Sequence, residues 1–306
     1  MSQSVTAAVL RRLALDESTK SFVMNSERLY PPMLRAALRY IGGETLDSCL
    51  RVAADTNQRG HAVSIDFMGE STRTRAESTA ATEEFLKIAD AIRIGRYDAS
   101  LSLDLSHIGL LVGADFCFDN ALAIAQAAAA ADTELMISAE GADRTDDVLA
   151  MHGRLCEHSA NVGITLQAYL QRTAHDLNTL VARPGKIRVV KGAFDADPAL
   201  VLPRGPELDA AFLALIRTLD QARRPFSIAT HDPVIIDRAR SHMDEGVGEF
   251  EMLRGVESEQ LDALHDTGYR TREYLPYGRE WFLYLCNRIA ESPPTLFDAI
   301  AAAFGD

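Results

Sequence analysis

From residue 62 onward, short apolar runs rich in β-branched residues alternate with longer amphipathic segments. Runs of about four to eight such residues are typical of buried strands, and apolar positions three and four apart are typical of helices. The predicted strands are Ala62–Met68, Ala99–Leu105, Glu134–Ser138, Gly163–Ala168, Lys186–Lys191, Phe226–Thr230, Glu249–Leu253 and Thr271–Leu275. Eight strands, each followed by helical sequence, predict an α/β fold of the (β/α)8 TIM barrel type. A doubly wound open sheet is the alternative, and the absence of Gly-x-Gly-x-x-Gly after any strand weakens it.

The first 60 residues predict helices instead. Apolar positions recur with helical spacing at Val9 and Leu13 and again over residues 33–41, and Thr45 is the expected N-cap of a further helix. No Pro/Ser-rich linker divides the chain, so we expect one domain. In it, residues 1–60 form a helical segment packed on a barrel of residues 61–306, and the tail from Ser292 forms a closing helix.

The stretch from Tyr274 to Glu291 begins as an extended aromatic run and continues as a helix. The expected break lies at Pro276 and Gly278. Helical spacing then relates Trp281, Tyr284, Leu285, Arg288 and Glu291. A strand therefore delivers one tyrosine, and the helix after it delivers a tyrosine, an arginine and a glutamate on one side. The plain alternative is an amphipathic helix with a solvated polar face.

Polar residues mark the predicted strand ends, where the chemistry of a barrel gathers. They are Asp66, Glu70, Asp104, Ser106, His107, Ser138, Glu140, Gln167, Arg188, Lys191, Thr230, His231 and Tyr274. A polar side chain inside a barrel is costly unless it is paired or bound to a ligand. The pattern predicts a large polar ligand. For Arg188 and Lys191 the alternative is a structural ion-pair network.

The composition of the chain argues against several classes of binding partner. The 306 residues carry a formal net charge of −13, and the 31 basic residues form no long run, which disfavours nucleic acid or an anionic membrane. The four cysteines lie far apart without zinc-site spacing, and the eight histidines form no metal-binding cluster, so no metal is predicted. Without a signal peptide or an apolar run of membrane-spanning length, we expect a cytoplasmic protein with no integral membrane segment.

Several motifs together resemble the flavin-dependent proline dehydrogenase family over roughly residues 40–292. They are Glu44–Leu46, Ser64–Glu70, Gln167–Leu170, Arg188–Phe194, Ala229–His231, Glu249–Leu253 and Tyr274–Glu291, in the order and spacing of that family. The resemblance implies a distorted barrel whose final helix lies over the C-terminal face. It also implies non-covalently bound FAD and oxidation of a C–N bond by hydride transfer to flavin N5.

The resemblance further implies roles for individual residues. Arg188 is expected against the flavin near N5, and Gln167 at the isoalloxazine edge. The other expected cofactor contacts are Ala139, Val190, Lys191, Gly192, Thr230, His231 and Glu291. Tyr274 and Tyr284 are expected to wall the substrate pocket. Arg188, Tyr274 and Ser138 are the residues expected to take part in catalysis.

Three positions depart from the family pattern. Family members hold the proline carboxylate with one lysine and two arginines. In this chain Asp104 stands at the lysine position and Asn287 at the first arginine position, so only the second arginine, Arg288, is retained. Ser138 stands at the position where family members have an aspartate near the flavin and the substrate. Glu70 lacks its expected arginine partner, because Asn287 replaces that arginine. The carboxylate pocket thus changes by three charge units.

We therefore predict a small amine-type substrate with a cation or neutral polar group in place of the carboxylate. The alternatives are an ordinary proline dehydrogenase, which converts L-proline to 1-pyrroline-5-carboxylate, and a non-catalytic homologue. The electron acceptor stays open between quinone, oxygen and a protein.

Overall fold

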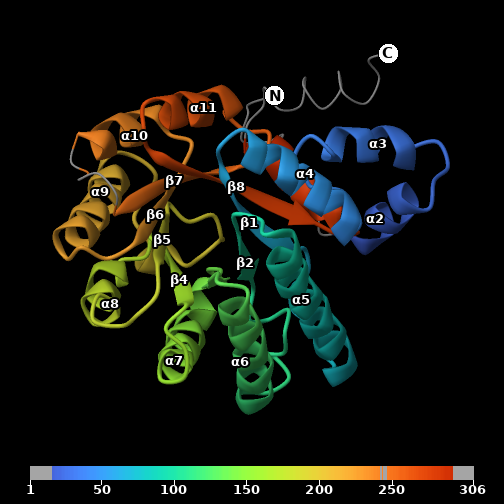
Figure 1. The fold of residues 1–306 in the computed structure, drawn as a ribbon, viewed down its shortest axis with the longest axis horizontal. Coiled ribbons are helices and arrows are strands. Elements are labelled where there is room, and N and C mark those ends of the chain that lie inside the picture. Colours follow the sequence, from blue (N-terminus) through green and yellow to red (C-terminus); the bar gives the residue numbers. More distant parts are fainter. Residues whose placement is uncertain (1–15, 242, 244–246, 292–306) are drawn as a thin grey trace.

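A closed barrel of eight parallel strands forms the centre of the molecule (Figure 1). The computed structural model describes residues 16–241, 243 and 247–291. The strands are β1 Ala62–Phe67, β2 Ala99–Leu103, β3 Leu135–Ile137, β4 Val162–Gln167, β5 Ile187–Val190, β6 Phe226–Ala229, β7 Gly248–Leu253 and β8 Arg270–Tyr277. Each pairs in parallel with the next, and β8 closes on β1. The predicted (β/α)8 barrel is confirmed.

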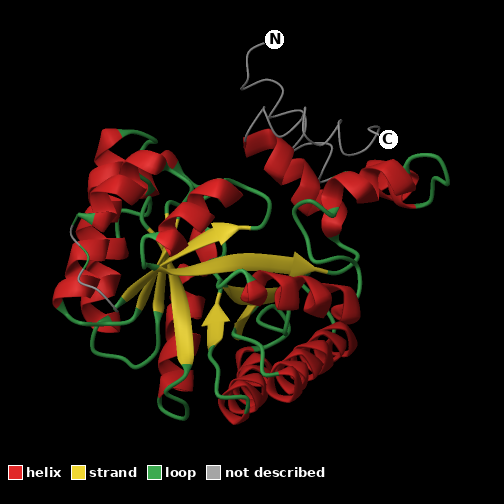
Figure 2. Cartoon of the chain, turned by 45° about the horizontal axis from the view of Figure 1, so that its top comes forward, coloured by secondary structure: helices red, strands yellow, loops and turns green. Residues whose placement is uncertain are grey.

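Helices surround the strands (Figure 2). They are α5 Arg75–Gly95, α6 Ala114–Ala130, α7 Thr145–Cys156, α8 Thr173–Leu180, α9 Pro206–Gln221, α10 Pro233–Arg240, α11 Ser258–Asp266 and α12 Trp281–Glu291, with short 3-10 turns at Ala142–Arg144 and Pro198–Leu200. A capping box between Thr74 and Glu77 begins α5. Its buried face repeats at Ala81, Phe85 and Ile88, as helical spacing requires. Within the described ranges no helix is both long and apolar enough to cross a membrane.

The N-terminal helices are α2 Glu17–Met24, α3 Tyr30–Ala37 and α4 Leu46–Gln58. Thr45 caps α4 as predicted, in a capping box with Ser48. Helices α2 and α3 lie to one side of the barrel (Figures 1 and 2) and share a separate apolar cluster with α12 around Trp281. Val9, Leu13 and the tail from Ser292 lie outside the described residues.

Glu44 fastens α12 to these N-terminal helices. Its Oε1 accepts the Tyr30 hydroxyl at 2.6 Å and the Trp281 indole N–H at 3.0 Å. Because Trp281 is the first residue of α12 and is fully buried, this contact fixes where the helix begins. Helix α12 is thereby held over the C-terminal ends of the strands.

Strand β8 runs past the expected break and ends at Tyr277. Its pairing with β7 stops at Tyr274, whereas pairing with β1 continues through Pro276 and Tyr277. The proline nitrogen therefore removes no ladder bond on the side that β7 has left open. Gly278 follows the strand; its φ of 126° favours glycine, and its N–H donates to the Gly43 carbonyl at 3.0 Å.

A lower layer of polar side chains crosses the N-terminal half of the barrel. Glu249 accepts Lys186 at 2.8 Å, Arg272 at 2.9 Å and the Ser227 hydroxyl at 2.5 Å. Arg272 also donates to Ser100 at 3.0 Å. Burial alone would raise the pKa of Glu249, but the two cations hold it below its ordinary value. This layer satisfies its own charges, so it needs no ligand.

Candidate active site

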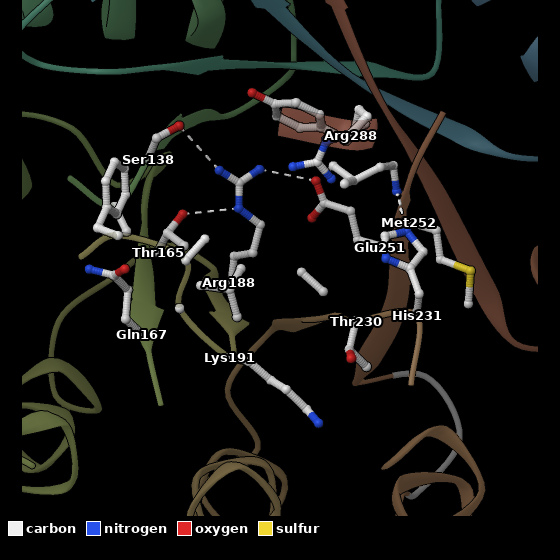
Figure 3. A pocket seen from close by; sticks show the side chains of 18 of the residues that line it. Ser138, Thr165, Gln167, Arg188, Lys191, Thr230, His231, Glu251, Met252 and Arg288 are labelled. Carbon is white, nitrogen blue, oxygen red and sulfur yellow. Dashed lines mark hydrogen bonds and ion pairs between the residues drawn. The ribbon is translucent and has the colours of Figure 1, made fainter. Parts of the chain in front are cut away.

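A cavity of about 630 Å³ opens at the C-terminal ends of the strands, beneath α12 (Figure 3). It is within the usual size of a ligand pocket. The predicted site residues that line it are Ser138, Ala139, Gln167, Arg188, Val190, Lys191, Gly192, Thr230, His231, Tyr274, Tyr284 and Arg288. Sequence positions far apart are thus brought to one chamber, because parallel strands present their C-terminal ends together.

The remaining predicted residues lie around this cavity or beyond it. Asp104 is half-buried directly after β2, and Glu70 is exposed in the loop after β1. Asn287 is half-buried on α12. Glu291 ends α12, and its side chain lies outside what the structure describes. Within the described residues Glu70 forms no ion pair.

Arg188 is the hub of an upper polar layer. Its Nη1 donates to Glu251 at 3.0 Å, its Nε to Thr165 at 2.9 Å and its Nη2 to Ser138 at 3.3 Å (Figure 3). Nη2 also donates to Ser102 at 3.1 Å. Although burial opposes the charge, Glu251 holds the pKa of Arg188 above its ordinary value. The guanidinium is therefore charged and fixed in orientation.

Lys191 is also in an ion-pair network. Its Nζ contacts Asp209 at 2.7 Å and Asp232 at 2.6 Å. The ion-pair alternative raised for Arg188 and Lys191 is thus a real feature of both residues. The two carboxylates more than cancel the ammonium charge at this wall of the cavity.

The segment after β5 approaches the cavity through Gly192. Its φ is 106°, and a Cβ atom there would come within 2.2 Å of the Tyr169 ring. Arg204 donates to the Gly192 carbonyl at 2.7 Å and lines the cavity as well. Only glycine fits this close turn, which leaves backbone groups facing the chamber.

Two side chains on other walls are anchored by the backbone. His231 Nε2 accepts the Leu253 N–H at 2.9 Å. Burial lowers the pKa of His231 to about 4, so the ring is neutral at pH 7 and carries its proton on Nδ1. Gln167 Nε2 donates to the Glu140 carbonyl at 2.9 Å, which fixes the amide at the cavity wall.

A group of carboxylates adjoins Tyr274 and Ser138. The Tyr274 hydroxyl donates to Asp66 Oδ2 at 2.5 Å, and the Tyr274 ring lies 5.6 Å from the Arg188 guanidinium. Burial raises the pKa of Asp66 to about 6. Burial and then the neighbouring Asp66 raise the pKa of Asp104 well above its ordinary value, opposed by the Ser138 hydroxyl. The carboxylates of Asp66 and Asp104 therefore repel each other at the C-terminal ends of β1 and β2.

The raised pKa of Asp66 predicts a pH-dependent stability. A group whose folded pKa is raised stabilises the fold below its unfolded pKa and loses that contribution as pH rises through the folded value. For Asp66 the window lies between 3.8 and about 6. We expect the free energy of unfolding of Asp66→Asn, relative to that of the unaltered chain, to increase by about 2 kcal/mol from pH 4 to pH 7. Urea unfolding at both pH values measures this gain, with exposed Asp90→Asn as the baseline; an equal difference at both would contradict it.

Thr165, Arg204 and Glu251 are residues of this site that the sequence did not predict as functional groups, and Asp66 was predicted only as a polar strand-end residue without a role of its own. Thr165 pairs in register with Arg188, and Glu251 pairs with Ala229 on the neighbouring strand. Polar residues two apart on one strand, such as Thr165 and Gln167, point to the same face. That spacing was the available clue.

Within the described part of the chain, no group of three or more His, Cys, Asp or Glu side chains could hold a metal.

Known proteins resemble this chain in sequence. Residues 49–293 match the profile of the family described as "Proline dehydrogenase". Proline dehydrogenase 1 of Bacillus subtilis strain 168 is 30% identical over 290 residues, covering 93% of this chain and 96% of the relative. Proline dehydrogenase of Deinococcus radiodurans is 30% identical over 271 residues, covering 85% of this chain and 87% of the relative.

Solved structures with the same fold are longer proteins. Proline utilization A (PutA) from Bdellovibrio bacteriovorus, inactivated by N-propargylglycine, matches with a TM-score of 0.80 at 17% identity. The match covers 98% of this chain and 39% of that chain. A mutant PutA from Bradyrhizobium japonicum matches with a TM-score of 0.72 at 18% identity, covering 100% of this chain and 41% of that chain. At these identities the likeness concerns the fold alone.

Proposed function

Because this chain belongs to the proline dehydrogenase family, whose members are flavin-dependent oxidoreductases acting on CH–NH groups, we propose that it oxidises a small amine other than free L-proline. The proposed cofactor is FAD, held across the C-terminal face of the barrel. The proposed substrate carries a cation or a neutral polar group where proline carries its carboxylate.

The cavity suits a flavin by its donors and its shape. Arg188 and Gln167 lie on one wall, and the turn at Gly192 would be filled by any Cβ atom. Arg204 and the neutral His231 add donors that a phosphate or ribose can use. Lys191 fits the diphosphate role less well as it stands, because Asp209 and Asp232 hold its ammonium. It would serve there by exchanging one carboxylate for a phosphate oxygen.

FAD, when bound, supplies the acceptor for the hydride that leaves the substrate carbon. The chain supplies orientation and charge. Tyr274 and Tyr284 form the walls that would orient the substrate and exclude water from it. Arg188 keeps a fixed positive group at the chamber, with its orientation set by Thr165 and Ser138. Asp66, with a pKa of about 6, is largely ionised at pH 7 and can hold a substrate ammonium proton at its Oδ atoms.

The observation that carries the substrate proposal is the pair of aspartates beside the chamber. Asp66 raises the pKa of Asp104 through repulsion, and Glu140 and Glu70 add to that shift. A further carboxylate about 4 Å from one of them would meet repulsion of about 4 kcal/mol at an effective dielectric near 20. An ammonium, guanidinium or hydrazinium group would relieve that repulsion, and an amide would not add to it.

Three ring compounds that differ in one substituent test this proposal. We expect L-prolinamide and 2-(aminomethyl)pyrrolidine to bleach the FAD-loaded protein anaerobically at least about tenfold faster than L-proline, which is about 1.4 kcal/mol. Stopped-flow absorbance of the oxidised flavin is the measurement. All three keep the ring C–H and N–H, so the comparison isolates the substituent.

Each other outcome supports an alternative. L-Proline that bleaches the flavin as fast as its neutral and cationic analogues would assign ordinary proline dehydrogenase activity, as the relatives' names describe for them. A yellow protein that none of these amines, nor a wider panel of guanidines and hydrazines, reduces would indicate a non-catalytic flavin-binding homologue. Protein that binds no FAD would contradict the proposal at its first step.

A further inference from the structure

We propose that Glu251 sets the reduction potential of the flavin by cancelling the charge that Arg188 presents to it. The inference rests on the proposed binding of FAD and is independent of which amine is the substrate. Glu251 acts on the cofactor through Arg188. Its effect is therefore expected in the potential itself, apart from any turnover.

The pair is direct and enclosed. Arg188 Nη1 lies 3.0 Å from Glu251 Oε1, and the two side chains are 6% and 3% exposed. Both residues line the cavity, from β5 and β7 respectively (Figure 3). Mobile ions screen charges within such an enclosed site far less than exposed charges. A charge on either partner therefore acts on the chamber at full strength.

The other groups that contact Arg188 orient it without neutralising it. Thr165, Ser102 and Ser138 accept its hydrogen bonds through neutral hydroxyls. The Tyr274 ring lies 5.6 Å from the guanidinium. Asp66 also raises the pKa of Arg188, but by less than Glu251 does. Glu251 is thus the main counter-charge.

Two-electron reduction adds negative charge to an isoalloxazine ring that takes up fewer protons than electrons. A bare guanidinium beside the ring would favour that reduced form strongly. A guanidinium paired with a carboxylate carries no net charge and favours it less. The pairing therefore lowers the potential, and the reduced cofactor passes its electrons on more readily.

The test is a potential measurement on FAD-loaded protein by anaerobic equilibration with a reference dye, using a chemical reductant and no amine. We expect Glu251→Gln to raise the potential by at least a tenfold change in the oxidation–reduction equilibrium, or about 30 mV for a two-electron couple. Thr165→Val is the matched control, because it removes an Arg188 hydrogen bond without changing charge. Its shift should stay within about threefold.

The double variant Arg188→Gln with Glu251→Gln gives the second comparison. Its amide pair is neutral like the native ion pair, so its potential should return to within about tenfold of the unaltered chain. If Glu251→Gln alone does not fold, the double variant tests whether the charge balance of this pair sets the flavin potential. The proposal is overturned if Glu251→Gln leaves or lowers the potential, if Thr165→Val shifts it equally, or if the neutral pair shifts it more than tenfold. Failure to bind FAD would instead overturn the proposed function.

Discussion

Asp104→Lys is expected to turn the chain toward carboxylate-bearing substrates. The change adds two positive charge units beside Asp66 and Ser138, and it replaces a carboxylate that Asp66 repels with a cation. A cation–carboxylate pair at about 4 Å is worth about 4 kcal/mol at an effective dielectric near 20. Allowing for imperfect geometry, we expect reduction by L-proline at low substrate to become about 10- to 100-fold faster. Reduction by 2-(aminomethyl)pyrrolidine should slow by a similar factor.

Controls separate local charge from net charge. Asp104→Asn changes one unit and should give an intermediate result. Asp90→Lys makes the same two-unit change at an exposed position paired with Arg93 near the end of α5. Because that end of the helix lies at the opposite face of the barrel, we expect no change in preference. The pocket argument fails if Asp104→Lys leaves the ratio of the two rates unaltered, or if Asp90→Lys changes it equally.

Arg188→Gln is expected to have the second large effect, on both stability and chemistry. It leaves Glu251 buried without its cation, and breaking a buried pair from one side costs about 3–5 kcal/mol. Urea unfolding should show that loss in the free energy of unfolding. If the Arg188→Gln variant still binds FAD, the preferred amine should reduce its flavin about 10²- to 10³-fold more slowly, because one oriented electrostatic group is gone.

The double variant with Glu251→Gln distinguishes the two effects. It removes both charges, so most of the lost stability should return. The slow reduction should persist, because the oriented N–H donors of the guanidinium are not restored to the chamber. If unfolding energies of the single and double variants are equal, the ion pair does not stabilise the barrel; if the double variant reduces at the native rate, Arg188 does not aid the chemistry.

The fold follows from the sequence because each strand is buried on both faces. Runs such as Ile187–Val190 are apolar or β-branched apart from the one inward arginine, so their position is visible without any partner. The exception is the end of β8, where Pro276 predicted a break. Pro276 is tolerated because β7 has already ended beside it, a fact about the register of two distant segments. A local pattern does not contain that information.

The membership of the site was predictable, but its internal pairing was not. Strand-end polarity and the family motifs placed Arg188, Gln167 and His231 at one chamber, as the structure does. The partner of Arg188 is Glu251, 63 residues away. Which of several inward carboxylates an arginine meets depends on strand order, tilt and stagger around the barrel. The same reason hid the contact between Tyr274 and Asp66.

The two polar layers of the barrel bear on how this protein could change over time. Among the described residues, no hydrogen bond or ion pair joins the lower layer around Glu249 to the upper layer around Arg188. Substitutions at the mouth that leave no buried charge unpaired therefore keep the hydrogen bonds of the lower layer intact. Such independence makes the barrel an evolvable platform, on which a new specificity can arise while the older architecture is inherited intact.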